Sequence, residues 1–336
     1  MYNRKNVFIT GGTGSFGQRF ISYLIKNYKP KKIIIYSRDE HKQHSMQSNK
    51  LFSNIKNLRY FLGDVRDLER LKFATRDVDI IVHAAALKHV PAAEYNPFEF
   101  IKTNIIGAQN LIECALFNNV DKTIALSTDK ASSPINLYGA TKLCSDKLFI
   151  SANNYKGNTN MKFSVVRYGN VLASNGSVLP VFLKQAKTGQ LNITDKNMTR
   201  FNITLDQGVD FVSKSLSRMI GGEIFVPKLF SYNIMTMARA ISKNSKIKLT
   251  GIRPGEKIHE EMIADTEVRN CIEYKNFYII KPHSQYTQWN LAKFNKKNKI
   301  KNIKLNHNQL PYRSDTNANF LKLKDLEKIV KKYLSD

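Results

Sequence analysis

Short apolar runs alternate with amphipathic stretches through the first half of the chain. The apolar runs lie within residues 7–10, 31–43, 58–67, 79–90, 124–127 and 161–174. Runs of this kind, separated by helical patterns, are typical of buried parallel strands with helical crossovers. The sequence therefore predicts an α/β fold built on a doubly wound parallel sheet.

The second half of the chain is less regular. Its segments at 198–212, 222–227 and 252–262 suggest a smaller lobe that is interwoven with the last part of the sheet. Beyond residue 285 the chain is rich in lysine and asparagine, and it closes with an amphipathic helical pattern. We expect three parts. A sheet domain at 1–170 is completed by later segments, a lobe is formed mainly by 171–285, and a basic extension with a terminal helix covers 286–336.

The composition is that of a globular protein. With 336 residues and 42% hydrophobic content, the chain can bury the core of one large or two unequal domains. It has no apolar run of transmembrane length and enters a strand almost at once, so we expect a cytoplasmic protein without a membrane helix or a signal peptide. Three widely spaced cysteines fit a reducing compartment and offer no metal-binding spacing.

The formal net charge of +26 raises the question of a nucleic-acid partner. However, the lysines are spread along the chain, and the densest run, at 293–304, contains only one aromatic residue, Phe294. We therefore expect no nucleic-acid partner. A positive surface still attracts an anionic nucleotide substrate.

A glycine-rich loop follows the first apolar run. Gly11, Gly14 and Gly17 stand between this strand and an amphipathic helical pattern. Glycines at such a turn let the backbone approach a pyrophosphate, whose charge the N-terminus of the helix then meets. The spacing G-x-x-G-x-x-G departs from the simplest fingerprint, but the flanking strand and helix supply its context, so we predict a dinucleotide site.

The residues after the second strand bear on the choice of dinucleotide. An NAD site commonly places an acid here, whereas this chain has Ser37 and Arg38, with Lys42 further on. Arg38 favours NADP, although the neighbouring Asp39 keeps NAD open.

The third strand ends at Asp64 and Val65, where a side chain can touch the adenine. The small residues after the fourth strand allow a close backbone approach and lead to Lys88 at the mouth of the site; they are Ala84, Ala85 and Ala86.

The stretch at 127–142 carries the candidate chemistry. Tyr138 and Lys142 are four residues apart and share one face of a predicted helix. A nearby ammonium favours the phenolate, so we expect Lys142 to lower the pKa of Tyr138 and suit it to acid–base catalysis. Upstream, Thr128, Asp129 and Lys130 follow the end of a strand, where parallel sheets bind ligands.

Three charged residues of the second half are candidates for contacts with a nucleotide. Arg200 and Arg253 can each pair with a diphosphate in a bidentate manner, and Glu256 can accept a hydrogen bond from a ribose or a uracil. Surface salt bridges are the alternative interpretation of these three residues.

Together these motifs resemble the extended short-chain dehydrogenase/reductases. The matching segments are 10–17, ALSTDK, Tyr138 to Lys142, RYGNVLASNGSVLP and RPGEKIHEEM. More narrowly, the chain up to about residue 285 resembles the inverting UDP-N-acetylglucosamine 4,6-dehydratases of the pseudaminic-acid pathway. In the related retaining dehydratases an Asp-Glu pair stands where this sequence has Asp129 and Lys130. The resemblance implies a Rossmann-like sheet domain with a C-terminal substrate-binding lobe.

The resemblance also implies the site residues. Those implied to bind NADP, which each cycle regenerates, are Gly11, Thr13, Gly14, Ser15, Phe16, Gly17, Ser37, Arg38, Lys42, Asp64, Val65, Ala84, Ala85, Ala86, Asn104, Tyr138 and Lys142. Those implied to bind UDP-N-acetylglucosamine are Lys88, Asn170, Ser177, Val178, Arg200, Arg253 and Glu256. The implied partner is a second copy of the chain, in a homo-oligomer such as a hexamer, paired through the helices that begin near Asn104 and Asn136.

The implied mechanism assigns each catalytic residue a role. Tyr138 takes the proton of the C4 hydroxyl, Thr128 holds the C4 oxygen, and Lys142 binds the nicotinamide ribose. Lys130 removes the C5 proton, while protonated Asp129 donates a proton to the departing C6 hydroxyl. A UDP-sugar 4-epimerase, a retaining dehydratase and an NADP-sensing regulator on the same fold remain alternatives.

Overall fold

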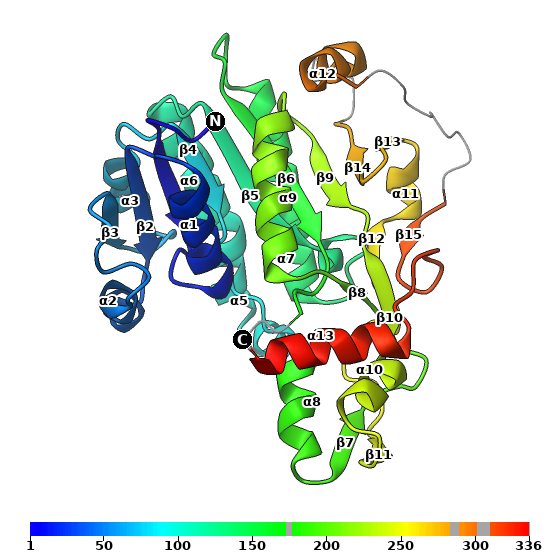
Figure 1. Cartoon of the computed structure of the whole chain (residues 1–336). Coiled ribbons are helices and arrows are strands. Elements are labelled where there is room, and N and C mark those ends of the chain that lie inside the picture. The colour runs from blue at the N-terminus through cyan, green and yellow to red at the C-terminus, as the bar shows by residue number, and fades with distance from the viewer. Residues whose placement is uncertain (173–176, 283–288, 301–309, 336) are drawn as a thin grey trace.

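The structure, a computed structural model, describes residues 1–172, 177–282, 289–300 and 310–335. Within them a nine-stranded sheet forms the centre of the molecule (Figure 1). Its order from one edge to the other is β3 (Leu58–Leu62), β2 (Lys32–Ser37), β1 (Asn6–Thr10), β4 (Ile80–His83), β5 (Lys122–Thr128), β6 (Lys162–Tyr168), β9 (Ile224–Pro227), β14 (Phe277–Ile280) and β13 (Cys271–Glu273). The first seven strands of this order are parallel, whereas β14 is antiparallel to both of its neighbours, β9 and β13.

The strand order confirms the predicted doubly wound sheet. It reverses between β1 and β4, and a ligand site is expected at such a switch point, outside the carboxyl ends of the strands. Every residue of β1 and β4 is buried, which explains why these strands read as continuous apolar runs.

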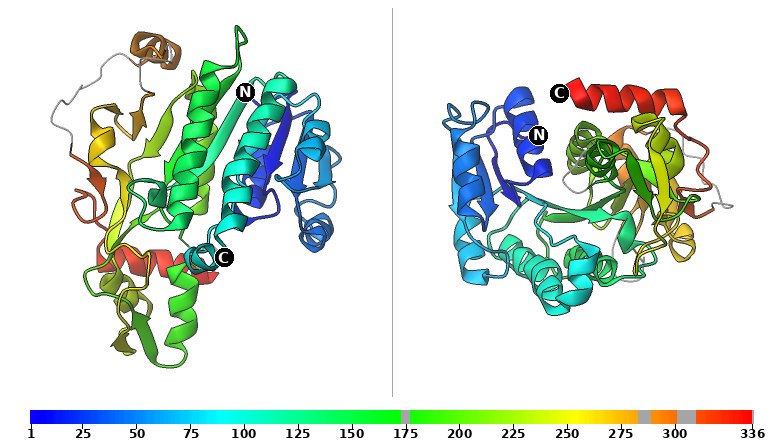
Figure 2. Two further views of the ribbon diagram at one scale, coloured as in Figure 1. Left: turned by 180° about the vertical axis from the view of Figure 1, so that it is seen from behind. Right: turned by 90° about the horizontal axis from the view of Figure 1, so that it is seen from below.

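Helices cover both faces of the sheet, as Figures 1 and 2 show. On one face α1 (Ser15–Asn27) lies beside α9 (Leu205–Arg218), and on the other α6 (Gly107–Phe117) lies between α3 (Leu68–Ala74) and α7 (Leu137–Ser151). The other helices of this part are α2 (Glu40–Ser48), α4 (Val90–Tyr95), α5 (Pro97–Phe100), α11 (Asp265–Val268) and α12 (Leu291–Asn298).

One predicted helix begins earlier than its pattern suggested. The sequence placed a helix start near Asn104, but Asn104 lies inside a π-helical segment, Ile101–Ile106, that joins α5 to α6. Pro97 is the first residue of α5, a position where its fixed φ suits a helix start and its missing N–H is not needed. The second helix of the expected pair, α7, does begin at the predicted place, directly after Asn136.

A smaller lobe lies beyond the carboxyl ends of the strands (Figure 1). Its own apolar cluster includes Leu179, Met237 and Leu326. The lobe contains α8 (Val178–Ala186), α10 (Ile234–Ile241), α13 (Leu323–Ser335) and the paired strands β7 (Gln190–Ile193) and β11 (Lys246–Leu249). Two further pairs connect it to the sheet: β8 (Thr199–Asn202) with β10 (Phe230–Asn233), and β12 (Glu261–Ile263) with β15 (Tyr312–Arg313).

The chain crosses between sheet and lobe several times. Strand β9 and helix α9 lie between lobe segments in the sequence. In the structure β9 belongs to the sheet and α9 packs beside α1 on its face. We expected the terminal helix to belong to a separate extension at 286–336, but α13 is part of the lobe. It packs against α10 and buries Leu326 and Val330 in the apolar cluster of the lobe, because its apolar stripe needs a partner surface.

Among the described residues, no helix has both the length and the apolar character that crossing a membrane requires.

Candidate active site

A cavity of about 1630 Å³ lies between the strand ends and the lobe. Its lining comes from the loop after β1, the ends of β5 and β6, helix α8 and the segment at 250–260. Pockets for one small ligand typically measure roughly 300–1,000 Å³, so this cavity is large enough for two. The lining is drawn from segments between Gly11 and Glu260 that come together only in the folded chain.

The glycine-rich loop closes tightly on the strand ends. Gly11 has φ +66°, and a Cβ there would lie 2.9 Å from the backbone nitrogen of Ala85. A Cβ on Gly17 would lie 2.5 Å from the backbone of Gly12. Both positions therefore need glycine. Helix α1 starts directly after Gly14 without a side-chain cap, so its first N–H groups are available to a phosphate.

The end of β2 presents basic residues to the cavity. Ser37, Arg38 and Lys42 all line it. Asp39 accepts a hydrogen bond from the backbone N–H of Lys42 and pairs with its ammonium at 3.1 Å, so the acid is engaged by helix α2. Arg38 lies 3.5 Å from the carboxylate of Asp64 at a half-exposed position. A ligand phosphate at Arg38 would compete with Asp64.

Asn104 supports the cavity wall from behind. Its side chain accepts a hydrogen bond from the N–H of Leu87 and donates one to the Leu87 carbonyl, both at 2.9 Å. It also donates to the Thr141 hydroxyl at 3.0 Å. Asn104 thereby fixes the loop after β4 against α7. The resemblance implied that Asn104 binds the cofactor. Its contacts in the structure indicate that it supports the wall of the cavity.

The start of α7 is pressed against the turn that follows β5. Asn136 caps the helix by accepting from the N–H of Gly139 at 2.8 Å, and it donates to the Gly255 carbonyl at 2.7 Å. A Cβ on Gly139 would overlap the carbonyl oxygen of Lys130. The absence of a side chain at Gly139 therefore lets Tyr138 and Lys130 share one wall of the cavity.

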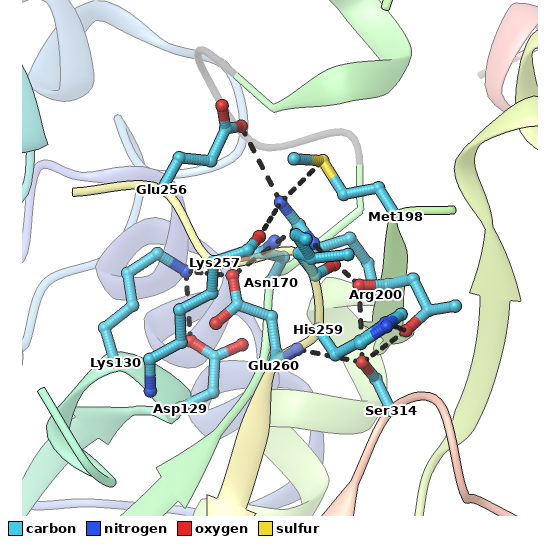
Figure 3. A network of polar contacts seen from close by, with 12 residues as sticks. Asp129, Lys130, Asn170, Met198, Arg200, Glu256, Lys257, His259, Glu260 and Ser314 are labelled. Carbon is cyan, nitrogen blue, oxygen red and sulfur yellow. Dashed lines mark hydrogen bonds and ion pairs between the residues drawn. The ribbon is translucent and has the colours of Figure 1, made fainter. Parts of the chain in front are cut away.

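Lys130 lies between two buried carboxyl groups (Figure 3). Its Nζ is 3.2 Å from Oδ1 of Asp129 and 2.9 Å from Oε1 of Glu260. Asp129 also accepts a hydrogen bond from the Thr128 hydroxyl at 2.9 Å, and the amide oxygen of Asn170 lies 3.4 Å from the ammonium. Asp129 and Glu260 are almost fully buried, so each depends on these partners.

The charges of this cluster shift the pKa values of its members. Burial raises the pKa of Asp129, and the Glu260 carboxylate raises it further against the opposing effect of Lys130. Burial alone lowers the pKa of Lys130, but the negative charges of Asp129 and Glu260 outweigh burial and raise it. The ammonium form of Lys130 is therefore strongly favoured.

Tyr138 differs from the expectation that its pKa is lowered. Burial raises the pKa of Tyr138 to about 12, although the Lys130 ammonium and the Thr128 hydroxyl oppose this rise. The ammonium group that lowers the pKa of Tyr138 is thus that of Lys130, whereas we expected this effect from Lys142. Lys142 is itself buried, and burial lowers its pKa while Asp146 opposes the change.

The lobe contributes two arginines in different states. Arg200 is buried and donates to the backbone carbonyls of Thr199, Ile258 and Lys257 at 2.7 to 3.0 Å. Arg253 is exposed and pairs with Glu256 at 3.0 Å. Arg253 is therefore free to reorient toward an anion, whereas Arg200 would exchange chain contacts for ligand contacts.

The structure brings most of the sequence-derived residues to one cavity. Those that line it are Gly11, Thr13, Gly14, Ser15, Phe16, Gly17, Ser37, Arg38, Lys42, Val65, Ala84, Ala85, Ala86, Lys88, Thr128, Lys130, Tyr138, Lys142, Asn170, Ser177, Val178, Arg200, Arg253 and Glu256. Asp64, Asn104 and Asp129 lie behind or beside this lining. Part of the RYGNVLASNGSVLP segment, 173–176, falls outside the described residues.

Sequence reasoning missed Glu260 and Asp146. Glu260 belongs to the RPGEKIHEEM segment, from which only Arg253 and Glu256 were chosen. Glu260 is a second acidic residue in that segment, which was a possible signal. The sequence alone does not show that the segment folds back against Lys130. Asp146 lies one turn after Lys142 and accepts from the Ser127 hydroxyl at 2.8 Å. Its i+4 spacing from Lys142 was a signal that could have identified it.

Comparison with known proteins gives matches over most of the chain. Residues 7–282 match the family model described as polysaccharide biosynthesis protein. A Campylobacter jejuni protein named UDP-N-acetylglucosamine 4,6-dehydratase (inverting) is 57% identical over 284 residues, 84% of each chain. A Rickettsia bellii protein named UDP-glucose 4-epimerase is 42% identical over 289 residues, 83% of this chain and 84% of that one. The solved structure of Pen from Bacillus thuringiensis is 35% identical, covers 99% of both chains and superposes with a TM-score of 0.87.

The contact of α7 with Lys130 gives a first prediction. Gly139→Ala places a methyl group on the Lys130 carbonyl, so we expect the free energy of unfolding to fall by about 1–3 kcal/mol. Urea unfolding measures this change. The matched control is Gly208→Ala in α9, where, beyond the neighbouring residues of its own helix, the nearest atom to the new methyl is Cδ1 of Ile203 at 3.9 Å, so the change should be neutral or stabilising. Equal effects of the two substitutions would contradict the predicted overlap.

Proposed function

Because this chain belongs to the polysaccharide biosynthesis protein family, among the extended short-chain dehydrogenase/reductases, we propose that it dehydrates a nucleotide sugar. The substrate we propose is UDP-N-acetylglucosamine, and the reaction is 4,6-dehydration with inversion at C5. The observation that carries this proposal is the Asp129–Lys130 pair directly after β5, because Lys130 lines the same cavity as Tyr138 and its charge acts on the tyrosine. The name of the Campylobacter jejuni relative supports it.

The sheet side of the cavity fits a nicotinamide dinucleotide. The tight glycine loop and the uncapped start of α1 suit its pyrophosphate, Arg38 and Lys42 suit the 2′-phosphate of NADP, and Lys142 suits the ribose next to the nicotinamide. When bound, the dinucleotide supplies the hydride acceptor for C4 and the hydride donor for C6, so no cofactor is consumed. The lobe side then holds the UDP-sugar near Arg253 and Glu256.

Tyr138 takes the proton of the C4 hydroxyl in this proposal. Its pKa of about 12 in the free chain means that the phenolate needs further positive charge, and the Lys130 ammonium and the Thr128 hydroxyl already act in that direction. Oxidation at C4 produces a ketone that acidifies the C5 proton. Tyr138 thereby prepares the elimination that the neighbouring pair completes.

Asp129 and Lys130 remove water across C5 and C6. Transfer of one proton across the 3.2 Å between them converts carboxylate and ammonium into acid and amine. The Lys130 amine can then take the C5 proton while the Asp129 acid protonates the departing C6 hydroxyl. Burial raises the pKa of Asp129, which favours the acid form this step requires.

The product we propose is UDP-2-acetamido-2,6-dideoxy-β-L-arabino-hexos-4-ulose, the result of reprotonation at C5 from the opposite face. Such a sugar would be the product of the first step in the biosynthesis of pseudaminic acid or of a related surface glycan.

In this proposal the protein works in the cytoplasm as a homo-oligomer. The apolar residues exposed on and beside α4 to α7 support pairing of copies on that face; they include Tyr95, Phe98, Ile106, Phe117 and Ile135.

A UDP-sugar 4-epimerase is the second candidate, because the Rickettsia bellii relative has that name. An epimerase shares the tyrosine, the lysine and the dinucleotide but loses no water. The buried Asp129–Lys130 pair favours dehydration, since a buried acid beside an amine has no task in epimerisation at C4. An NADP-sensing regulator would need neither group.

Incubation with UDP-N-acetylglucosamine separates these functions. We expect early NMR spectra to show the L-arabino 4-ketone, with deuterium from D₂O at C5 and a C4 deuterium label carried to C6. A D-xylo ketone at the earliest times identifies a retaining dehydratase, and UDP-N-acetylgalactosamine identifies an epimerase. Loss of the C4 label to solvent would overturn the internal hydride transfer.

Tyr138→Phe removes the oxygen that accepts the C4 proton and keeps the ring. We expect turnover to fall roughly 10²- to 10⁴-fold with folding intact, because an acid–base group is lost. Steady-state kinetics and circular dichroism measure the two properties. The matched control is Tyr155→Phe, which removes the same atom from a half-exposed ring and should leave turnover unchanged. A Tyr138→Phe protein with full activity refutes the proposed role.

Arg38→Ala tests the choice of cofactor. Removing one charged contact should weaken NADP binding roughly tenfold or more and leave NAD binding nearly unchanged, because only NADP carries the 2′-phosphate. Titration of cofactor-stripped protein measures both affinities, with the exposed Arg76→Ala as the control. If denatured wild-type protein releases NAD alone, the NADP assignment is wrong.

A further inference from the structure

Glu260 joins the acid–base pair from a distant part of the chain. It directly precedes β12 and lies 130 residues after Lys130, yet its Oε1 accepts a hydrogen bond from the Lys130 ammonium at 2.9 Å. Its side chain is 2% exposed. A carboxylate this deeply buried is costly unless cations compensate it. Lys130 is therefore its main partner, and Figure 3 shows the two groups facing each other.

The backbone of Glu260 is fixed on both sides by Ser314. The Ser314 hydroxyl accepts from the N–H of Glu260 at 2.9 Å, and the N–H of Ser314 donates to the Glu260 carbonyl at 2.8 Å. The hydroxyls of Ser314 and Thr199 lie 2.7 Å apart, which ties this contact to β8. Ser314, which lies outside the matched family range of 7–282, thus holds the backbone of Glu260 in place.

A second cation also lies close to the carboxylate of Glu260. The Nε of Arg200 is 3.5 Å from Oε1, the same oxygen that faces Lys130. The second oxygen, Oε2, is buried without a hydrogen-bond partner among the described residues. These cations outweigh the effect of burial and lower the pKa of Glu260, so it is a carboxylate. Its negative charge is therefore directed at Lys130 and Arg200.

We propose that Glu260 is a positioning residue that acts through Lys130: its fixed negative charge keeps one shared proton in the Asp129–Lys130 pair and holds the Lys130 side chain in the cavity. This inference rests on the proposed dehydratase function and adds to it. Without Glu260 the pair would lose its proton more readily, and the acid needed for the departing hydroxyl would be absent.

The proton balance of the elimination fits this role. The C5–H bond breaks as an N–H bond forms on the Lys130 amine, and the electron pair becomes the C5–C6 double bond. The C6–O bond breaks, and the departing oxygen takes the proton of Asp129 to leave as water. The pair then holds an ammonium and a carboxylate, so its proton count is unchanged. Proton transfer from Lys130 to Asp129 resets it, and Glu260 remains a carboxylate throughout.

Several charged or titratable groups surround Lys130. Asp129 comes from its own turn, and the others come from α7, β8 and the segment before β12; they are Tyr138, Arg200, Lys257 and Glu260. The pKa of Lys130 is raised because Asp129 and Glu260 outweigh both burial and the positive charge of Arg200. Removing one of the two negative charges should therefore lower the pKa of Lys130.

The test follows Lys130 directly by NMR of the holoenzyme with ¹³C at the lysine Cε. Lys130→Arg identifies the resonance. In the wild-type protein we expect Lys130 to stay an ammonium over the whole folded range, whereas in Glu260→Gln its titration should move down by roughly one to three pH units. The alkaline limb of the turnover profile should move in the same direction, because the pair then loses its proton at lower pH.

Two variants control this experiment. Glu260→Asp keeps the charge and should restore the Lys130 titration, even where the shorter side chain slows turnover. Glu261→Gln makes the same chemical change one residue away, at a side chain with no contact to Lys130 among the described residues, and should leave the titration unchanged.

An identical Lys130 titration in the wild-type and Glu260→Gln proteins, including no titration in either, overturns the inference. This readout needs no turnover, so it is separate from the test of the proposed function. Absence of any keto product from UDP-N-acetylglucosamine would instead overturn the dehydratase proposal.

Discussion

The pairing of Lys130 with two buried carboxyl groups is the constraint on which the site depends. Buried charges are costly without partners, and here Asp129, Lys130, Glu260 and Arg200 compensate one another inside the protein. They come from the end of β5, from β8 and from the segment before β12. The complete cluster therefore depends on β8 and the segment before β12 packing against the turn that follows β5.

Close backbone contacts serve the same closure. Gly139 lets α7 rest on the Lys130 carbonyl, and Gly11 lets the loop after β1 rest on the backbone after β4. In each contact, backbone atoms occupy the space that a side chain would need. Because both glycines lie where an element meets the cavity, the positions of the loop after β1 and of the turn after β5 follow from backbone packing.

The fold alone does not distinguish the functions found among the relatives. Proteins named as an inverting dehydratase and as an epimerase both match more than four-fifths of this chain. The frame of sheet, glycine loop and Tyr138–Lys142 helix suits either reaction. What favours dehydration is a proton donor and a proton acceptor next to each other, in a place dry enough to raise the pKa of Asp129. The distinction is therefore one of local electrostatics.

The sequence by itself determined the doubly wound sheet, the glycine loop and the strand end with its helix, because these depend on local patterns of apolar and glycine residues. The cavity is lined by Gly11 and residues 13–17 of that loop, and by Ser127, Thr128, Lys130, Tyr138 and Lys142. The tertiary structure alone decided the partner of Lys130, since Glu260 lies 130 residues away and no periodicity connects them. It also reversed the expected shift of the Tyr138 pKa, because burial is a property of the whole fold and here outweighs the nearby ammonium. Helix α13 joined the lobe for the same reason: its apolar stripe shows that a partner surface exists, while only the packed chain shows where.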